Sequence, residues 1–199
     1  MTEVERDEEL VRRFRAGETD AFTDLVRRHE HRVYSLCLRV LGDADAAADV
    51  AQDTFLTVLR KLDGFRGDAA FTTWLHRVAV NACYDELRRK RRRPMLHVVA
   101  DDELQHEPGP PTADHADEVA GTRDAASALA AIPEEFRVAL VLADVQDMAY
   151  DQIAQVLDVP IGTVKSRVHR GRLALAAVLG LEPGSREPLA APRTSEQEP

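Results

Sequence analysis

Five basic side chains lie close together in one short stretch near the C-terminal end of the chain. The stretch Ile161–Leu175 reads IGTVKSRVHRGRLAL, and no acidic residue occurs between Val159 and Leu181. Arginine can donate two hydrogen bonds to O6 and N7 of guanine, whereas lysine and a threonine near a helix start suit phosphates. The side chains that we expect to contact duplex DNA are Thr163, Lys165, Ser166, Arg167, His169, Arg170 and Arg172.

The residues around this stretch predict two helices joined by a tight turn. Apolar residues at helical spacing are expected to face inward at Ile153, Ala154, Val156 and Leu157 before the turn, and at Val164, Val168, Leu173 and Leu175 after it. Asp158-Val159-Pro160 breaks the helix, and Asp158 tolerates the left-handed conformation that such a turn needs. The pattern predicts a helix-turn-helix unit that reads DNA, although an amphipathic helix pair that closes a bundle would look similar.

A second basic cluster lies at the end of the predicted helix 72–93. Six consecutive basic residues, Arg88–Arg93, follow turns that carry Trp74, Leu75 and Val78 on an apolar side. The run can complement the negative end of the helix dipole, bind phosphates without reading sequence, or form part of a larger DNA-binding surface. At this spacing Trp74 is expected in the core more than on a base-stacking surface.

The acidic residues are unevenly distributed along the chain. The 199 residues include 35 acidic and 26 basic ones, a formal net charge of -9. Residues 95–122 carry seven acidic residues, three prolines and no lysine or arginine, so basic surfaces remain on either side. This composition cannot bury enough apolar surface to fold, and it predicts a flexible linker; residues 181–199 are expected to form a disordered tail. We expect the parts on either side of the linker to be fixed relative to each other only on a partner.

Every other segment predicts helices, so we expect an all-α fold with two small helical domains. The N-terminal domain, residues 1–94, should contain four helices: 7–15, a helix capped by Thr19 that ends at Gly42, 43–62 and 72–93. The C-terminal domain, residues 123–180, should resume near Arg123 and place Pro133 in the first turn of a helix before the helix-turn-helix.

Several other classes of protein are disfavoured. No apolar run approaches the ~20 residues of a membrane span and the N-terminus is acidic, so we expect a cytoplasmic protein without a signal peptide or a membrane span of its own. Cys37 and Cys83 lie in apolar helical patterns and are expected to be buried, reduced thiols. No zinc spacing appears, and we expect neither a metal nor another cofactor.

Two alternative functions were weighed against this pattern. Asp45, Asp49 and Asp53 recur every four residues and could mimic a carboxylate metal site, as in a nuclease, but no second cluster completes it. A regulator that only binds duplex DNA would leave the N-terminal domain without a role. We therefore expect a protein that is not an enzyme and has no catalytic residue.

Two separated motifs resemble one protein family. DVAQDTFLTVLRKLDGFRGDAAFTTWLHRVAVNACYDELRR, followed after the linker by YDQIAQVLDVPIGTVKSRVHRGRLAL, is similar to the extracytoplasmic-function (ECF, group 4) sigma factors of bacterial RNA polymerase. The likeness covers about residues 7–178. WLHRVAVNAC is most similar to SigM-like members from actinobacteria. Departures are small: Asp158 stands where the family often has Gly, and Ala149 where a Ser often caps the helix.

The resemblance implies a non-enzymatic subunit that directs core polymerase to promoters and aids minus-10 melting. It implies a domain similar to sigma region 2 before the linker and one similar to region 4 after it. The implied partners are the beta-prime clamp helices and beta flap of core RNA polymerase, promoter DNA, and an anti-sigma factor that holds the protein inactive. The acidic linker is expected to follow a positively charged polymerase channel.

Site residues are implied at the positions that match the family motifs. The residues expected to bind the clamp helices are Asp49, Gln52, Asp53, Thr54, Leu56 and Leu59. The loop 63–70 and the helix after it are expected to hold the minus-10 strand through Phe65, Arg66, Arg77, Asn81, Arg88 and Arg89. The basic stretch that begins at Ile161 is expected to read the minus-35 element as duplex.

Overall fold

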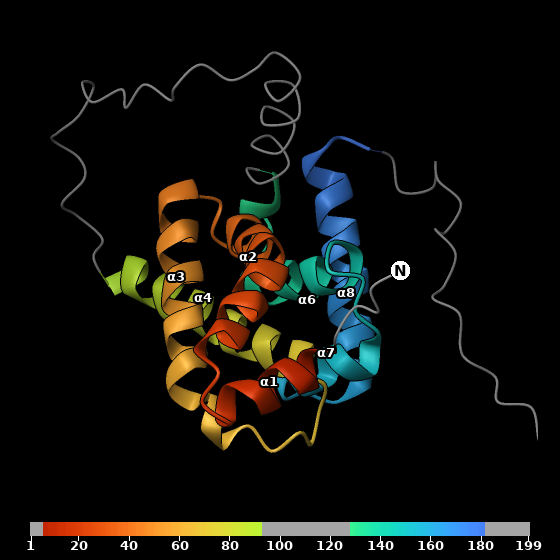
Figure 1. The fold of residues 1–199 in the computed structure, drawn as a ribbon. Coiled ribbons are helices and arrows are strands. Elements are labelled where there is room, and N and C mark those ends of the chain that lie inside the picture. Colours follow the sequence, from red (N-terminus) through yellow and green to blue (C-terminus); the bar gives the residue numbers. More distant parts are fainter. Residues whose placement is uncertain (1–5, 93–127, 182–199) are drawn as a thin grey trace, which may run out of the picture.

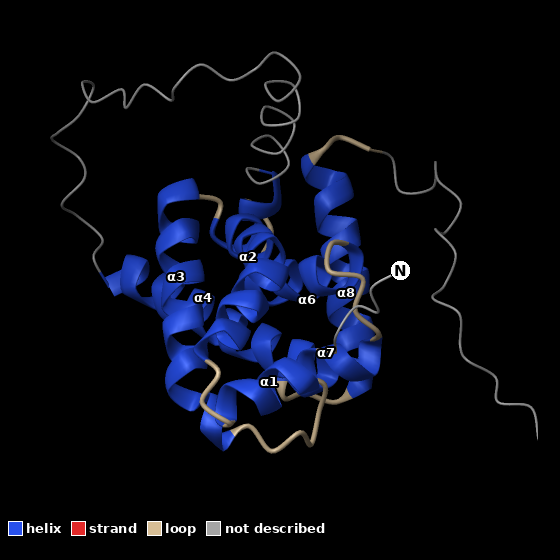
Figure 2. Cartoon of the chain, viewed as in Figure 1, coloured by secondary structure: helices blue, strands red, loops and turns tan. Residues whose placement is uncertain are grey.

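The computed structural model describes residues 6–92 and 128–181, and the regular elements within these ranges are all helical (Figure 1, Figure 2). The elements are α1 (Asp7–Arg15), α2 (Thr19–Leu41), α3 (Ala44–Lys61), the 3-10 turn η1 (Leu62–Gly64), α4 (Phe71–Arg92), α6 (Glu134–Asp144), α7 (Tyr150–Leu157) and α8 (Ile161–Val178). The prediction of an all-α fold is confirmed. The expected linker 95–122, the helix start near Arg123 and the tail from Glu182 lie outside the described residues.

Local signals explain most helix ends. Gly42 adopts a left-handed conformation with φ of 70° after α2, and its N–H donates to Leu38 O at 2.8 Å. Asp43 then caps α3, because its carboxylate accepts from the Ala46 N–H at 3.0 Å. The prediction that Thr19 caps α2 is wrong: Thr19 is the first helical residue, and Glu18 occupies the cap position without a side-chain bond.

The N-terminal domain packs α2, α3 and α4 around a core that α1 covers at one end (Figure 1). Leu25, Leu36 and Leu75 are among its fully buried side chains. Cys37 of α2 and Cys83 of α4 are both buried, with their sulfurs 3.7 Å apart, and neither forms a disulfide. The prediction that both thiols are buried is therefore confirmed.

In the C-terminal domain α6 forms the centre and α8 packs against it. Gly171 permits this approach: an added Cβ would stand 2.9 Å from Phe136 O and 3.1 Å from the Leu140 Cβ. Val164, Val168 and Gly171 form the buried side of α8. Leu173, which was expected to face inward, is 48% exposed, because it falls on the opposite side of a helix that turns 100° per residue.

The two domains pack against each other rather than standing apart. Helix α7 lies against α4 and α6 lies against α2. The Gln146 side chain donates to Arg32 O at 3.2 Å, and Arg91 of α4 forms an ion pair with Glu134 of α6. The expectation that only a partner fixes the domains is thus not met, because linker composition carries no information on the fit between two folded surfaces.

No helix among the described residues is both long enough and apolar enough to cross a lipid bilayer.

Candidate nucleic-acid interface

One face of α3 presents carboxylates and exposed leucines together. Asp49, Gln52 and Asp53 are exposed on its N-terminal half. One turn later Leu56 and Leu59 are 44% and 40% exposed, whereas Val50 and Val58 on the other side of the helix are buried. We call these five exposed residues the α3 face. Large exposed leucines beside acids are typical of a surface that binds a basic protein.

Thr54, which was predicted to belong to the same binding set, lies on the buried side of α3. Thr54 is 0% exposed, and its hydroxyl donates to Val50 O at 2.7 Å. A threonine hydroxyl that is bonded four residues back and covered by the core cannot contact a partner. Its place in the binding set is therefore wrong, and Thr54 supports the helix from inside.

A groove of about 520 Å³ between α3 and α4 continues the α3 face. Arg89 lines this groove with Asp49, Gln52 and Asp53, and its Nε lies 2.7 Å from a carboxylate oxygen of Glu86. This bond raises the pKa of Arg89 above its ordinary value, and the nearby charges of Asp49 and Asp53 add to the effect. The structure brings Arg89 beside the α3 face rather than to the loop 63–70.

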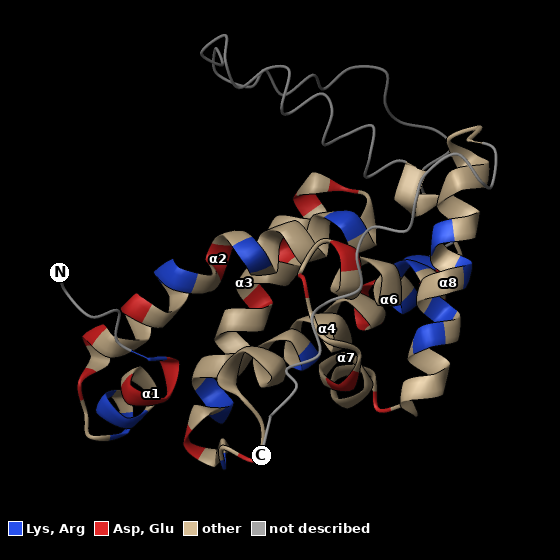
Figure 3. Cartoon of the chain, turned by 90° about the vertical axis from the view of Figure 1, so that its right-hand side faces the viewer, with Lys and Arg blue, Asp and Glu red and all other residues tan. Residues whose placement is uncertain are grey.

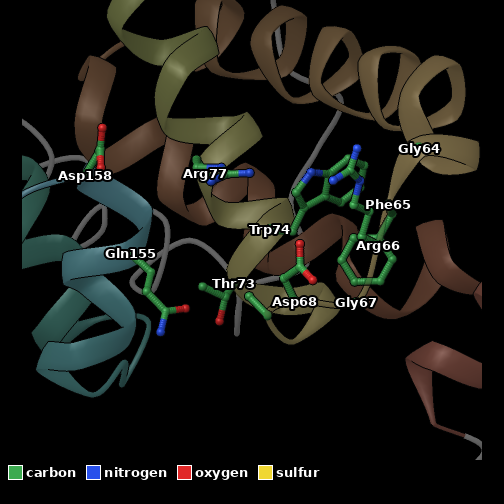
Figure 4. Close-up of a pocket in the computed structure, with 11 residues that line it drawn as sticks. Gly64, Phe65, Arg66, Gly67, Asp68, Thr73, Trp74, Arg77, Gln155 and Asp158 are labelled. Carbon is green, nitrogen blue, oxygen red and sulfur yellow. The ribbon is translucent and has the colours of Figure 1, made fainter.

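The loop between η1 and α4 forms one wall of a pocket of about 570 Å³ (Figure 4). Its N-terminal-domain lining, which we call the loop pocket, consists of Gly64, Phe65, Arg66, Gly67, Asp68, Ala69, Thr73, Trp74 and Arg77. Gln155 and Asp158 of the helix-turn-helix line its other side. An indole and two guanidiniums around an open space can hold an unstacked base and its phosphates.

The predicted minus-10 residues do not all reach the loop pocket. Arg66 and Arg77 line it, and Asn81 is exposed one turn beyond Arg77 on α4. Arg88 and Arg89 lie roughly three turns beyond Arg77 on α4, about 18 Å along its axis, and about two turns beyond Asn81. Arg88 forms an ion pair with Asp85 at 3.0 Å. The structure therefore separates these two arginines from the other candidates.

Phe65 is 8% exposed and belongs to an aromatic cluster in the core. Its ring centroid lies 5.9 Å from that of Phe71 and 5.2 Å from that of Trp74. A ring engaged on two sides has no free face for a base, so the prediction that Phe65 contacts DNA is not supported. Sequence reasoning missed Thr73 and, as a lining residue, Trp74, which is only half-buried.

The helix-turn-helix forms as predicted and places Lys and Arg along α8 (Figure 3). Asp158 adopts the left-handed conformation, with φ of 52° and ψ of 50°, between α7 and α8. Ala149 occupies the cap position before α7 without a side-chain cap, but its N–H donates to Gln152 Oε1 at 3.2 Å. Both departures from the family pattern are thus accommodated locally.

The candidates on α8 differ in how freely they face solvent. Ser166 and His169 lie opposite the buried side and are exposed, as is Lys165. Thr163 and Arg167 are half-buried. We call Ser166, His169 and Leu173 the outward line of α8, since their positions project away from Val164 and Gly171.

Two arginines of α8 are held by α6. The Arg170 guanidinium lies over the Phe136 ring, 5.7 Å from its centroid. Arg172 donates to Asp144 from Nε at 3.0 Å and from Nη2 at 2.6 Å, which raises the pKa of Arg172. A guanidinium paired in this two-pronged way is turned along the flank of the helix rather than outward.

The alternative of a nuclease with a carboxylate metal site is not supported. In the described part of the chain, no group of three or more His, Cys, Asp or Glu side chains could hold a metal ion.

Comparison with known proteins accounts for both domains. Residues 25–93 match the family Sigma-70 region 2, and residues 122–175 match Sigma-70, region 4. The chain is 37% identical over 188 residues to the RNA polymerase sigma-H factor of Pseudomonas aeruginosa, covering 90% of this chain and 96% of that protein. It is 36% identical to the ECF RNA polymerase sigma-E factor of Escherichia coli K12, covering 88% and 95%.

The chain belongs to the sigma-70 family, as a sigma factor of the ECF type. It therefore acts in transcription initiation and directs RNA polymerase to promoters. The α3 face and the loop pocket fall within the region 2 match, whereas α1 precedes it; α6, α7 and α8 fall largely within the region 4 match.

Solved structures extend the likeness to both domains of this sigma factor. CnrH, in a complex with the cytosolic domain of CnrY, matches with a TM-score of 0.66 and 26% identity, covering 87% of this chain and 97% of that chain. RpoE of Bartonella quintana, in a complex with the anti-sigma factor NepR, shares the fold with a TM-score of 0.63 at 24% identity, covering 81% and 98%.

Proposed function

We propose that three surfaces divide the work of promoter recognition in this sigma factor. The α3 face binds the clamp helices of the core polymerase, the loop pocket holds the unstacked minus-10 strand, and the outward line of α8 reads the minus-35 duplex. The exposure of Leu56 and Leu59 beside carboxylates carries the first assignment. Acids repel DNA and leucines gain from burial, so this surface suits a basic protein helix pair.

In the loop pocket the roles follow from side-chain chemistry. Arg66 and Arg77 are placed to neutralise phosphates, and Trp74 offers the edge of an aromatic cluster for stacking. Asn81, exposed one turn from Arg77, can donate to and accept from the edge of a base. Arg89 is assigned to the groove beside the α3 face instead, and Arg88 lies next to it on α4, paired with Asp85.

At the minus-35 element we assign base reading to Ser166 and His169, with Lys165 and Arg170 on phosphate or on guanine at the groove edge. Arg172 is paired with Asp144, and Arg167 is half-buried, with a charge that lowers the pKa of Tyr84 of the N-terminal domain against the larger effect of burial. We assign Arg167 and Arg172 to positioning α8 on the duplex and to contacting phosphates after the domains separate.

An anti-sigma factor is the proposed negative regulator. The support is the fold shared with the sigma factor RpoE, which is found in a complex with the anti-sigma factor NepR, and the likeness to CnrH, which is found in a complex with CnrY. Both domains of this sigma factor contribute to the match, which covers 87% of the chain. We propose that such a partner stabilises the packed arrangement of the domains. We also propose that the protein acts in the cytoplasm on core polymerase. Its region 4 domain would bind the beta flap there.

Charge reversal on the α3 face tests the proposal. The double variant Gln52→Ala, Asp53→Lys should lose co-purification with core polymerase, because a like charge at a complementary interface costs several kcal/mol. Glu30→Lys on α2 is the matched control: it makes the same change of charge at an exposed residue outside the α3 face.

Circular dichroism and the unfolding midpoint should be unchanged in both proteins. Retained binding by the folded double variant, or equal loss in the Glu30→Lys control, would overturn the assignment of this face.

A further inference from the structure

We propose that Arg15 of α1 is a positioning residue for minus-10 recognition, which rests on the proposed role of the loop pocket. Its Nη2 donates to Leu62 O at 2.7 Å, to Asp63 O at 3.0 Å and also to Phe65 O. All three acceptors are backbone carbonyls at the point where the chain leaves α3 and η1 and enters the loop.

These carbonyls lie at a helix end, where backbone acceptors lose helical partners, and Leu62 O also accepts from the Phe65 N–H at 3.1 Å. The last carbonyls of α3 and η1 mark the negative end of the helix dipole, and a cation that donates to them stabilises the chain exit. Arg15 comes from 47 to 50 residues earlier in the sequence, so it acts as a cap supplied by another helix.

The bonds of Arg15 set where the pocket wall begins. Phe65 accepts one of them and turns its ring onto Phe71 and Trp74, at centroid distances of 5.9 and 5.2 Å. The next residue, Arg66, is the first pocket residue beyond this anchor, and Gly67 follows in a left-handed conformation with φ of 78°. Loss of the anchor frees Arg66 and loosens the Phe65 ring beneath Trp74 (Figure 4).

Helix α1 stays docked through contacts that do not involve Arg15. Leu10 and Val11 are buried, and Phe14 packs on Phe22 with ring centroids 5.6 Å apart. Asp7 lies 2.9 Å from His29 Nε2. Removal of the Arg15 guanidinium should therefore alter the loop and leave the position of α1 unchanged.

The experiment compares Arg15→Gln, Arg15→Lys and Arg12→Gln in the full chain assembled with core polymerase. Arg12 is the matched control on α1, where its guanidinium pairs with Glu9 one turn away. The DNA probe is a promoter selected by wild-type holoenzyme from a randomised library, with 2-aminopurine in the minus-10 strand. In the free protein, before core polymerase is added, emission of Trp74, the only tryptophan of the chain, reports loop packing.

We expect Arg15→Gln to reduce minus-10 opening roughly tenfold, the size expected for one lost hydrogen bond to a charged group, and to shift Trp74 emission to the red. Binding to core polymerase and to minus-35 duplex should remain as in wild type, and the unfolding midpoint should fall only slightly, through loss of the capping bonds. Arg15→Lys should recover part of the opening, and Arg12→Gln should match wild type.

Opening and emission as in wild type in Arg15→Gln would overturn the proposal. Losses of minus-35 binding and of stability as large as the loss of opening would also overturn it, because they would show a general structural role. The double variant Arg66→Ala, Arg77→Ala separates a failure of the role of Arg15 from a failure of the role of the loop pocket. If this pair also leaves opening intact, the loop pocket is not the minus-10 site and the proposed function fails with it.

Discussion

His76 of the N-terminal domain and Gln146 of the C-terminal domain meet across the domain boundary, with His76 Nε2 3.3 Å from Gln146 Oε1. His76 Nδ1 lies 2.6 Å from Thr72 O and must donate to it. Only the protonated ring can donate to both oxygens, yet burial lowers the pKa of His76, and the nearby Arg32 and His29 lower it further. The contact at the domain boundary therefore places opposed demands on the protonation of His76.

Acidification should separate the domains. A buried histidine whose pKa lies below its ordinary 6.5 resists protonation in the packed form and accepts a proton once the domains part. Proton uptake therefore accompanies opening, and the packed form loses stability as pH falls below about 6.5, by at most ~1.4 kcal/mol per pH unit. Small-angle scattering between pH 8 and 5.5 should show the radius of gyration rise.

The control for this prediction is His76→Gln, which retains hydrogen-bonding groups but does not titrate. Its radius of gyration should vary little over the same range, whereas His31→Asn, a change at an exposed histidine of α2, should behave as wild type. A rise of equal size in His76→Gln would assign the effect to other groups.

Replacement of Gly171 by Ala should destabilise the C-terminal domain. The new Cβ would stand 2.9 Å from a backbone oxygen of Phe136, so α8 must shift away from α6. We expect a loss of about 1–3 kcal/mol from overpacking, despite the better helix propensity of Ala. Gly162→Ala in the same helix meets nothing within 4 Å and should leave stability equal or slightly higher. Thermal unfolding of both variants is the measurement, and equal midpoints would count against the close contact.

Residues on α8 should separate into base readers and phosphate contacts. Ser166→Ala or His169→Ala should relax preference at one base pair, by about 1–3 kcal/mol. Arg172→Ala should weaken all sequences evenly, since Asp144 holds its guanidinium along the flank of the helix. Arg170→Ala relaxes one position if it reads guanine and acts evenly if it holds phosphate.

Selection from randomised minus-35 sequences with the holoenzyme measures the base preference of all four variants. A change of base preference in Arg172→Ala with no change in Ser166→Ala or His169→Ala would reverse this assignment of the helix faces.

Both thiols should be unreactive in the folded protein. The interaction with the Cys37 sulfur, and then burial, raise the pKa of Cys83 far above its usual range, so little thiolate forms. Iodoacetamide at pH 8 should label neither residue under native conditions and both in denaturant, as counted by mass spectrometry. Rapid native labelling of one thiol would show that α2 and α4 separate often.

Much of this protein follows from local pattern. The 3.6-residue repeat of apolar side chains, together with Gly42, Asp43 and Asp158 at helix ends, predicts the helices to within a residue or two. Two separated motifs were enough to indicate the family, because sequence order and spacing are preserved along the chain. The exposed acids of α3 and the basic run of α8 also follow from helical spacing.

Tertiary structure alone decided which members of each motif are accessible. Thr54 and Phe65 lie in motif positions but are buried, since burial depends on what packs over a side chain and not on its neighbours in sequence. Arg15 reaches carbonyls some fifty residues away, and His76 meets Gln146 across the domains. Such contacts join residues far apart in sequence, and they arise only when helices pack. The sequence thus determined the elements and the family, and the packing determined which side chains remain free to meet polymerase and promoter.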